Sequence, residues 1–288
     1  MAGKSHAVST MTTYSLAPGV AVVEREPGVI QFGMDATRVG VVEVEMQIVK
    51  ALNLLSKPMT RESVERLLVR AGMDDAAART LIEDLICYNI LWPEQPCQSV
   101  VVLGSSALAQ TLRTVFHNAG FILRNPLESE NMYSYIASVS EHFPVVAADM
   151  LHEPVNLAAA LSKCKGTFLP VSLVDSRGVI GPVHVDGRGP CPMCTHLHRI
   201  DVDGQWHQVV SQLADADRNT DNLVAQAVAV QSAVLVRRLA GWPSPPGAKS
   251  SRVMPGEQLE VDLYGHNQYR LVIEHPKCPY CFETKRNR

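Results

Sequence analysis

The residues with the clearest chemistry in this 288-residue chain are two pairs of cysteines. Cys191 and Cys194 form one pair, Cys278 and Cys281 form the other, and each pair has the pattern Cys-Pro-x-Cys. Two intervening residues let both thiolates of a pair turn onto one ion, and four thiolates make the tetrahedral set that suits Zn²⁺. We therefore predict a zinc site, structural rather than catalytic because four protein ligands leave no open position. A redox role for the pairs is the alternative.

The other three cysteines carry no comparable pattern. Cys87 falls on the apolar face of an expected helix, so we expect it in the core. Cys97 and Cys164 are expected to be bystanders. No cysteine has the histidine and acid partners of an activated nucleophile, so no catalytic residue is predicted.

A second segment stands where a phosphate-binding loop would stand. Gly104, Ser105 and Ser106 follow an apolar strand and open a helix. A nucleotide loop needs further glycines so that backbone N–H groups reach the phosphates, but Ser106 and Ala109 occupy those positions. Asp149 ends a later strand, but alone it cannot bind a nucleotide. We interpret this loop as a degenerate nucleotide loop kept for packing, and ATP is not expected as a cofactor.

The elements around these residues predict an α/β domain over residues 98–288. Apolar strands alternate with helices, which is typical of a mostly parallel sheet. A turn after residue 174 predicts a hairpin just before the first cysteine pair. The expected strands are Ser99–Leu103, Phe121–Leu123, Val145–Asp149, Thr167–Val174, Gln258–Leu263 and Gln268–Glu274, and the expected helices are Ala107–Ala119, Asn156–Lys163 and Thr220–Leu239.

A smaller domain is predicted over residues 17–93, after a flexible tail at residues 1–16. Three short β-type runs come first, separated by turn residues, and three helices follow. The runs are Val20–Glu24, Val29–Gly33 and Arg38–Val44. The first helix is Glu45–Ser56, and Thr60 and Asp74 or Asp75 are expected to cap the other two.

Composition excludes several classes of protein. Apolar residues make up 46% of the chain, and its formal net charge is -3. That net charge falls within residues 1–96, which opposes nucleic-acid binding. The apolar run Leu223–Val236 is too short and too polar to span a membrane, and residues 1–16 lack a secretory signal. We expect a cytoplasmic protein.

The charged segment after the first cysteine pair is expected to serve structure. Arg199, Asp201 and Asp203 are interpreted as ion pairs and helix caps that hold the cysteine pair in place.

The segment from Gly181 to Trp206 resembles a known family. It reads GPVHVDGRGPCPMCTHLHRIDVDGQW. It is similar to the cyclodehydratase-domain proteins of bacteriocin biosynthesis, ThiF-like proteins that bind leader peptides in azole-modified peptide (RiPP) pathways. Val29–Arg38 is similar to the family's N-terminal domain, and the resemblance covers about residues 17–282. Two positions depart from the pattern: Gly204 and Ala36 stand where the family has proline.

The resemblance implies a fold and a binding mode. It implies a degenerate Rossmann-like ThiF/MoeB-type adenylation fold, with a four-cysteine zinc site and an N-terminal PqqD-like winged-helix (β3α3) domain that captures peptides as an added strand. By this resemblance Arg38–Val44 would be the receiving edge and the third helix the other wall. The expected peptide-binding residues are Val39, Val41, Glu43 and Leu81.

The function implied is that of a non-catalytic scaffold. It would present a ribosomal precursor peptide to a YcaO-type cyclodehydratase, which forms azolines, and it would be a homodimer. One alternative is an active ATP-dependent adenylating enzyme that uses Asp149 with Arg113 or Arg124. Another is a zinc-containing winged-helix regulator.

Overall fold

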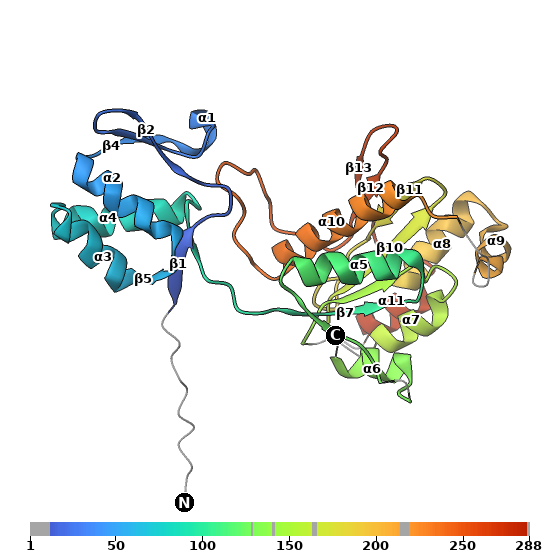
Figure 1. Ribbon diagram of the computed structural model, residues 1–288. Coiled ribbons are helices and arrows are strands. Elements are labelled where there is room, and N and C mark those ends of the chain that lie inside the picture. Colours follow the sequence, from blue (N-terminus) through green and yellow to red (C-terminus); the bar gives the residue numbers. More distant parts are fainter. Residues whose placement is uncertain (1–11, 128, 140–141, 163–165, 214–218, 287–288) are drawn as a thin grey trace, which may run out of the picture. The chain divides into compact units, whose positions relative to one another are not determined.

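The chain divides into two compact units in a computed structural model that describes residues 12–127, 129–139, 142–162, 166–213 and 219–286. The smaller unit comprises Met1–Pro96 together with Gly241–Ser251. The larger unit comprises Cys97–Ala240 and Arg252–Arg288. Figure 1 shows the elements of each unit along the chain.

The smaller unit holds two small antiparallel sheets. In one, β1 (Thr13–Leu16) lies between β5 (Met59–Thr60) and β6 (Leu91–Pro93). The other has the order β2-β3-β4, with bounds Val22–Glu26, Val29–Phe32 and Val41–Glu43. The expected tail at residues 1–16 is therefore wrong at its end, because Thr13–Leu16 pairs on both sides and its Tyr14 and Leu16 pack on the core. Residues 1–11 lie outside the described residues.

The helices of this unit follow the sequence prediction closely. They are α2 (Met46–Asn53), a 3₁₀ turn (Leu54–Ser56), α3 (Arg61–Arg70) and α4 (Asp75–Cys87). The backbone N–H of Ser63 donates to Thr60 Oγ1 at 3.2 Å, and Asp74 accepts from Ala76 at 2.9 Å. Both predicted caps are confirmed. Fully buried apolar side chains join the helices to the sheet: Ile30, Phe32, Leu52, Leu68 and Ile82.

One predicted strand begins too early. A helical turn, α1 (Ala36–Val39), replaces the first part of the expected strand Arg38–Val44. Asp35 caps this turn through the N–H of Thr37, and Gly40, at φ 88°, ends it. Local side-chain bonding of the aspartate outweighs the β-type pattern here. Val39 therefore does not share a strand face with Val41 and Glu43.

The larger unit is built on a seven-stranded sheet with the order β13-β12-β11-β10-β9-β7-β8. Strands β7 to β10 pair in parallel, and β11 to β13 extend the sheet in antiparallel fashion. The hairpin expected after residue 174 is confirmed. The bounds are β7 Ser99–Leu103, β8 Ile122–Arg124, β9 Val145–Ala148, β10 Phe168–Val174, β11 Arg177–Ile180, β12 Glu257–Val261 and β13 Gln268–Leu271.

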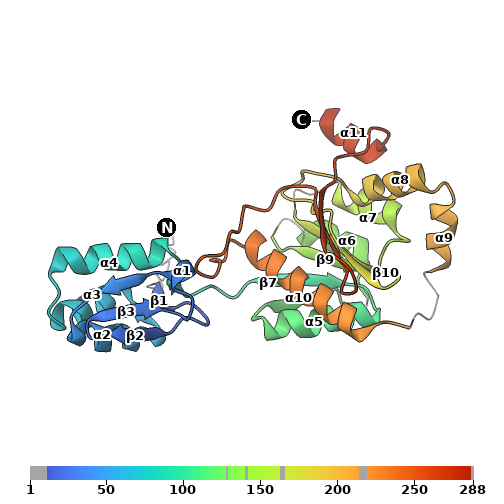
Figure 2. The same cartoon turned by 90° about the horizontal axis from the view of Figure 1, so that it is seen from above.

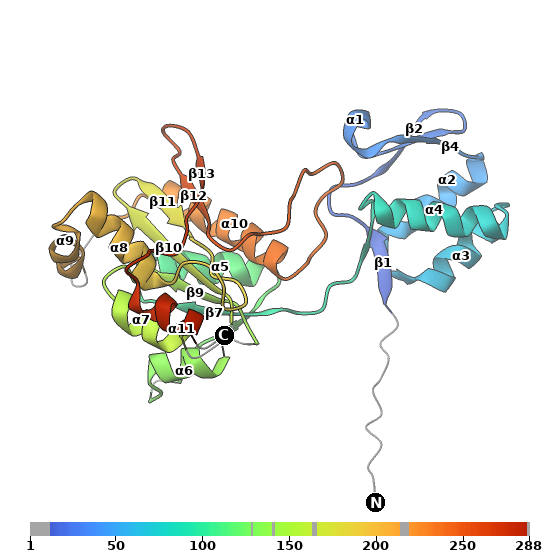
Figure 3. The ribbon, with the colours of Figure 1, turned by 180° about the vertical axis from the view of Figure 1, so that it is seen from behind.

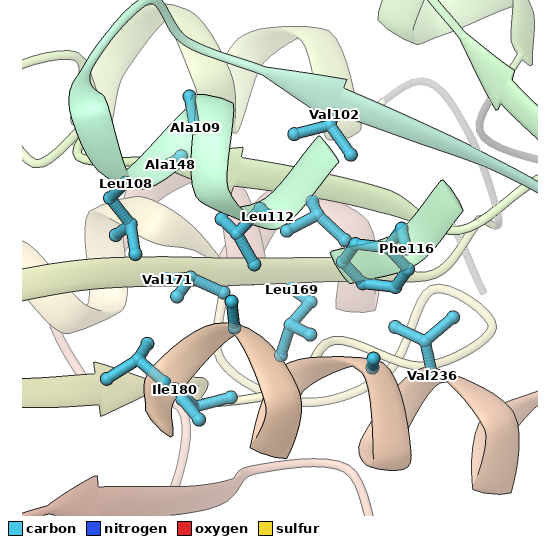
Figure 4. Packing of buried hydrophobic residues seen from close by; sticks show 14 of the residues in the cluster. Val102, Leu108, Ala109, Leu112, Phe116, Ala148, Leu169, Val171, Ile180 and Val236 are labelled. Atoms are coloured by element: carbon cyan, nitrogen blue, oxygen red, sulfur yellow. The ribbon is translucent and has the colours of Figure 1, made fainter. Parts of the chain in front are cut away.

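Helices cover both faces of this sheet (Figure 2). On one face α5 (Ala107–Asn118) and α10 (Asn222–Leu239) enclose the main core, and Figure 4 shows Leu112, Phe116 and Val236 packed over the sheet. On the other face α6 (Met132–Val139) and α7 (Pro154–Leu161) pack against Val101, Ala147 and Phe168. Gly178 has no room for a side chain, because a Cβ there would meet Val228 of α10. Among the described residues, no helix is long and apolar enough to cross a membrane.

Three helices near the cysteine pairs were not anticipated: α8 (Pro192–Val202), α9 (Trp206–Gln212) and α11 (Pro279–Arg286). Each is short, and two of them begin at a proline within a cysteine pair. Cys87 is exposed on α4, so its expected place in the core is wrong. Cys97 is also exposed, and Cys164 lies outside the described residues.

Candidate metal centre and nucleotide loop

Both cysteine pairs sit at the start of a helix. Cys191 is the N-cap of α8, whose first residue is Pro192, and Cys194 lies in the first turn. Cys278 directly precedes α11, which starts at Pro279 and contains Cys281. A proline suits the first helical position because its missing N–H has no partner there anyway. Helix N-termini also favour thiolates. Figure 3 shows α11 beside α7 and α8, where the two pairs meet.

The four sulfur atoms lie at metal-ligand spacing. Cys191 Sγ is 3.8 Å from Cys194 Sγ and 3.5 Å from Cys278 Sγ, and Cys194 Sγ is 3.3 Å from Cys281 Sγ. All four lie within 4.8 Å of one another. A tetrahedron of sulfur atoms around Zn²⁺, with bonds of about 2.3 Å, has S···S edges of about 3.8 Å. The cluster is therefore consistent with a metal site, and all four predicted ligands meet in it.

Four thiolates in this largely buried cluster would be costly in free energy without a cation. Cys191, Cys194 and Cys278 are buried. Hydrogen bonding to Cys194 and Cys278 raises the pKa of Cys191, whereas the hydrogen bond from Cys191 lowers the pKa of Cys278. Packing several negative thiolates together is unfavourable, so protons compete with a metal for this group. A bound divalent cation displaces those protons and neutralises the charge.

Polar contacts join the segments that carry the two cysteine pairs. His275, buried three residues before Cys278, lies with its Nε2 2.8 Å from Asp201 Oδ2 on α8. The hydrogen bond from His275 lowers the pKa of Asp201. His198 Nε2 donates to the carbonyl of Ile273 at 2.9 Å. The expected ion pair is confirmed for Asp201, whereas Asp203 accepts, among the described residues, only from the N–H of Gln205 two residues on, and α9 has no side-chain cap.

Arg199 departs from that expectation. Its guanidinium lies over the ring of Trp206, 5.3 Å from the centroid, and it forms no ion pair with a described carboxylate. It is half-buried in the fold. The sequence offered no signal for this contact, because Arg199 lies on α8 and Trp206 begins α9.

The loop after β7 is bonded to the chain's own backbone. Gly104 has φ 102°, and a Cβ there would lie 2.5 Å from the carbonyl oxygen of Ala148. The N–H of Ala109 in the first turn of α5 donates to Ser106 Oγ at 3.2 Å. Arg113 of α5 donates to the carbonyls of Val102 at 3.0 Å and Gly104 at 2.7 Å. Glycine is required here by the close approach of β9.

Asp149 and Arg124, which the adenylating alternative would use, also contact other residues of this chain. Asp149, at φ 55°, accepts from the N–H of Leu173 at 2.9 Å and thereby joins the ends of β9 and β10. Arg124 stacks on Phe143 at 4.4 Å. Ser105 is exposed beside the loop.

In the smaller unit, β4 is an edge strand with one free side. It pairs only with β3, among described strands, through Val29↔Glu43, Ile30↔Val42 and Gln31↔Val41. Val44 donates to the carbonyl of Gly28, so by antiparallel alternation the N–H groups of Val41 and Glu43 point away from β3. Both side chains are exposed. Val39 and Leu81 are half-buried and pack on the core of the unit instead.

No family model and no curated protein match this chain. The fold is nevertheless a known class: an α/β unit with a parallel centre and an antiparallel extension, joined to a small unit of sheets and helices.

The particular solved structures that share it include two heterocyclase structures and one from E. coli. A heterocyclase in complex with substrate and cofactor matches with a TM-score of 0.62 and 17% identity over 94% of this chain. The heterocyclase TruD matches with a TM-score of 0.61 and 17% identity, also over 94% of this chain. This chain spans only 39% and 43% of those two proteins. E. coli MccB, solved with ATP, matches at 0.52 and 13% identity over 93% of this chain and 99% of its own. The expected resemblance to ThiF-like peptide-modifying proteins is thus confirmed for the fold.

Proposed function

We propose that this protein is a non-catalytic, zinc-stapled scaffold that binds the leader of a ribosomal precursor peptide and presents it to a YcaO-type cyclodehydratase. The precursor residues Cys, Ser or Thr would become azolines on the partner enzyme. A homodimer is part of the proposal. The scaffold proposal accounts for two observations. The fold is shared with heterocyclases, and Arg113 and Ser106 at the loop after β7 bind the chain's own backbone.

The loop at Gly104 is the observation that carries the proposal. Arg113 donates to the carbonyl of Gly104, and Ser106 Oγ accepts from the N–H of Ala109, the third residue of α5. In a nucleotide-binding loop the backbone N–H groups at the start of the helix face the phosphates. Here Ser106 already binds one of these N–H groups, Arg113 is bound to a carbonyl of the loop itself, and Asp149 accepts from the backbone of β10. Adenylation would require each of these contacts to be exchanged for contacts with ATP.

The free edge of β4 supports the peptide-binding part. Added strands gain affinity from backbone hydrogen bonds and specificity from alternate side chains. Val41 and Glu43 offer both, since their N–H groups and their side chains are accessible. Val41 and Glu43 would contact the peptide, whereas Val39 and Leu81, which pack on the core, would support the peptide site from beneath. Among the similar structures, MccB is also described with MccA and one heterocyclase with a substrate.

The zinc-binding part rests on the sulfur geometry. Cys191, Cys194, Cys278 and Cys281 would hold the ion, which would join the chain end to α8. With four thiolate ligands it supplies folding energy and no reactive position.

A proline substitution tests the peptide edge. Glu43→Pro removes one N–H from the free side of β4 and puts a ring in the path of an added strand. We expect at least tenfold weaker binding of a fluorescein-labelled peptide, because a hydrogen bond is worth about 1 kcal/mol and the ring adds a clash. The probes are synthetic peptides from the short reading frames that flank the gene, and fluorescence anisotropy gives the affinity.

Glu24→Pro is the matched control. Glu24 is an exposed glutamate on β2, the opposite edge strand, and its N–H also points away from β3. We expect it to leave peptide affinity unchanged. Equal loss in both variants, with both folded by circular dichroism, would contradict capture at β4, and absence of binding by every flanking peptide would contradict the scaffold.

A further inference from the structure

A small cavity lies on the face of the sheet covered by α7 and α8, outside both the cysteine cluster and the nucleotide loop. Its floor comes from β9, β10 and β11, and its roof from the segment that contains Thr195, His196 and Arg199. It offers about 40 Å³ to the centre of a water molecule. One buried water needs roughly 10–15 Å³ of such space, so about three waters or one branched group of four carbons fit. The walls are mainly apolar: Met150, Leu151, Leu157, Phe168, Val174 and Val179.

Two buried polar atoms at this cavity lack partners. Thr195 Oγ1 and His196 Nδ1 form no hydrogen bond with any described residue. His196 is only 7% exposed, and its ring packs edge-on against His207. Buried polar groups without partners are rare because each costs free energy. Such atoms beside a cavity point to a polar group of a bound molecule.

Arg199 supplies a positive charge at the same cavity. The spacing of residues 195 and 199 puts Thr195 and Arg199 on one face of α8. Glu260, which acts electrostatically on Arg199, already forms salt bridges with Arg177 at 2.6 Å and with Arg270 at 3.6 Å. Burial lowers the pKa of Arg199, but arginine keeps its charge in proteins. Arg199 is thus a half-buried cation that forms no direct salt bridge with a described residue, and it shares the charge of Glu260 with Arg177 and Arg270.

We infer that this cavity binds a small carboxylate with a branched apolar body, held by Arg199 and Thr195. The apolar body fills the space beside Phe168, and the carboxylate accepts from the guanidinium and the threonine hydroxyl. A phosphate or sulfate would satisfy the charge but leave the apolar walls empty. The cavity continues into an open groove that shares Thr195, Arg199, Trp206 and Gln258, so a ligand has a path to solvent. The carboxylate belongs either to a free acid or to the C-terminus of a chain.

Binding can be read from Trp206, which lines the cavity. Zinc-replete protein is titrated with isovalerate, a free acid, and with N-acetyl-leucine, a model of a chain end. We expect saturable fluorescence changes with half-saturation at about 1 mM for at least one of them. 3-Methylbutanol, the neutral analogue, and acetate, the charge without the body, should bind at least tenfold more weakly. The tighter of the two acids identifies the source of the carboxylate.

Variants locate the binding on α8. Arg199→Met keeps the length of the side chain and should weaken isovalerate at least tenfold in isothermal titration, with 3-methylbutanol unchanged. Arg252→Met, at an exposed arginine of the same unit, should have no effect. Thr195→Val gives a second test if Arg199→Met does not fold, and it should weaken isovalerate about threefold. Binding of neither acid, or equal binding of acid and alcohol, would overturn the inference, whereas the peptide assay at β4 is independent of both.

Discussion

At the scale of single residues, the four cysteines make the sharpest prediction. Cys194 is fully buried, and its sulfur lies close to those of Cys191 and Cys281. Cys194→Ser removes one of four ligands, so we expect loss of the bound metal and a fall of about 4 kcal/mol or more in the free energy of unfolding. Metal analysis of the purified protein should give one zinc per chain for the natural sequence and little for the variant.

Cys87→Ser is the matched control, because Cys87 is an exposed thiol far from this cluster in the sequence. It should keep both the zinc and the stability. Acid should release the metal from the natural protein, because protons compete for thiolates and binding is lost as the pH falls. Full stability of zinc-free Cys194→Ser would contradict a structural metal.

How far single residues can be predicted from sequence depends on the range of their contacts. The pairs Cys191–Cys194 and Cys278–Cys281 were identifiable because the two-residue spacing is itself the ligand geometry. The cavity at Thr195 and Arg199 was not, because its walls come from strands far away in sequence. Nothing local distinguishes an arginine that stacks on Trp206 from one that pairs with an aspartate.

At the scale of elements, Gly104 tests whether the loop after β7 is kept for packing. Gly104→Ala adds a Cβ at φ 102° and at 2.5 Å from the carbonyl of Ala148. We expect about 3 kcal/mol of destabilisation in urea unfolding, the sum of backbone strain and overpacking. Gly120→Ala has a similar φ of 88° with no atom within 4 Å, so it should cost only about 1 kcal/mol of strain. Equal costs would contradict the packing role.

Element prediction succeeded where caps and periodicity agree. Thr60 and Asp74 mark helix starts through bonds to N–H groups two or three residues on, and the hairpin after β10 has its turn at Asp175. It failed at Val39, where an aspartate cap turned β-type residues into a helical turn. It also failed at β1, which is a strand only because distant residues of β5 and β6 pair with it. Such pairing leaves no local trace.

At the scale of the whole molecule, each unit has its own core. One apolar cluster belongs to the smaller unit, and separate clusters fill the two faces of the sheet in the larger one. The cysteine cluster lies entirely in the larger unit. A ligand that binds only one folded unit should stabilise that unit alone.

Calorimetry checks this separation and the proposed lack of nucleotide binding together. We expect two thermal transitions, and EDTA should lower only that of the larger unit, by roughly 10 °C, because about 4 kcal/mol of metal binding is lost. Cys194→Ser should show the same lowered transition and no further response to EDTA. That result would assign the transition to the larger unit, which holds the cysteine cluster. Millimolar Mg-ATP should move neither transition, since the side chains of Arg113, Ser106 and Asp149 are already bound to the chain's own backbone. A saturable rise of the larger unit's transition with ATP would favour an adenylating enzyme over a scaffold, and one transition shifted as a whole by EDTA would mean that the units unfold together.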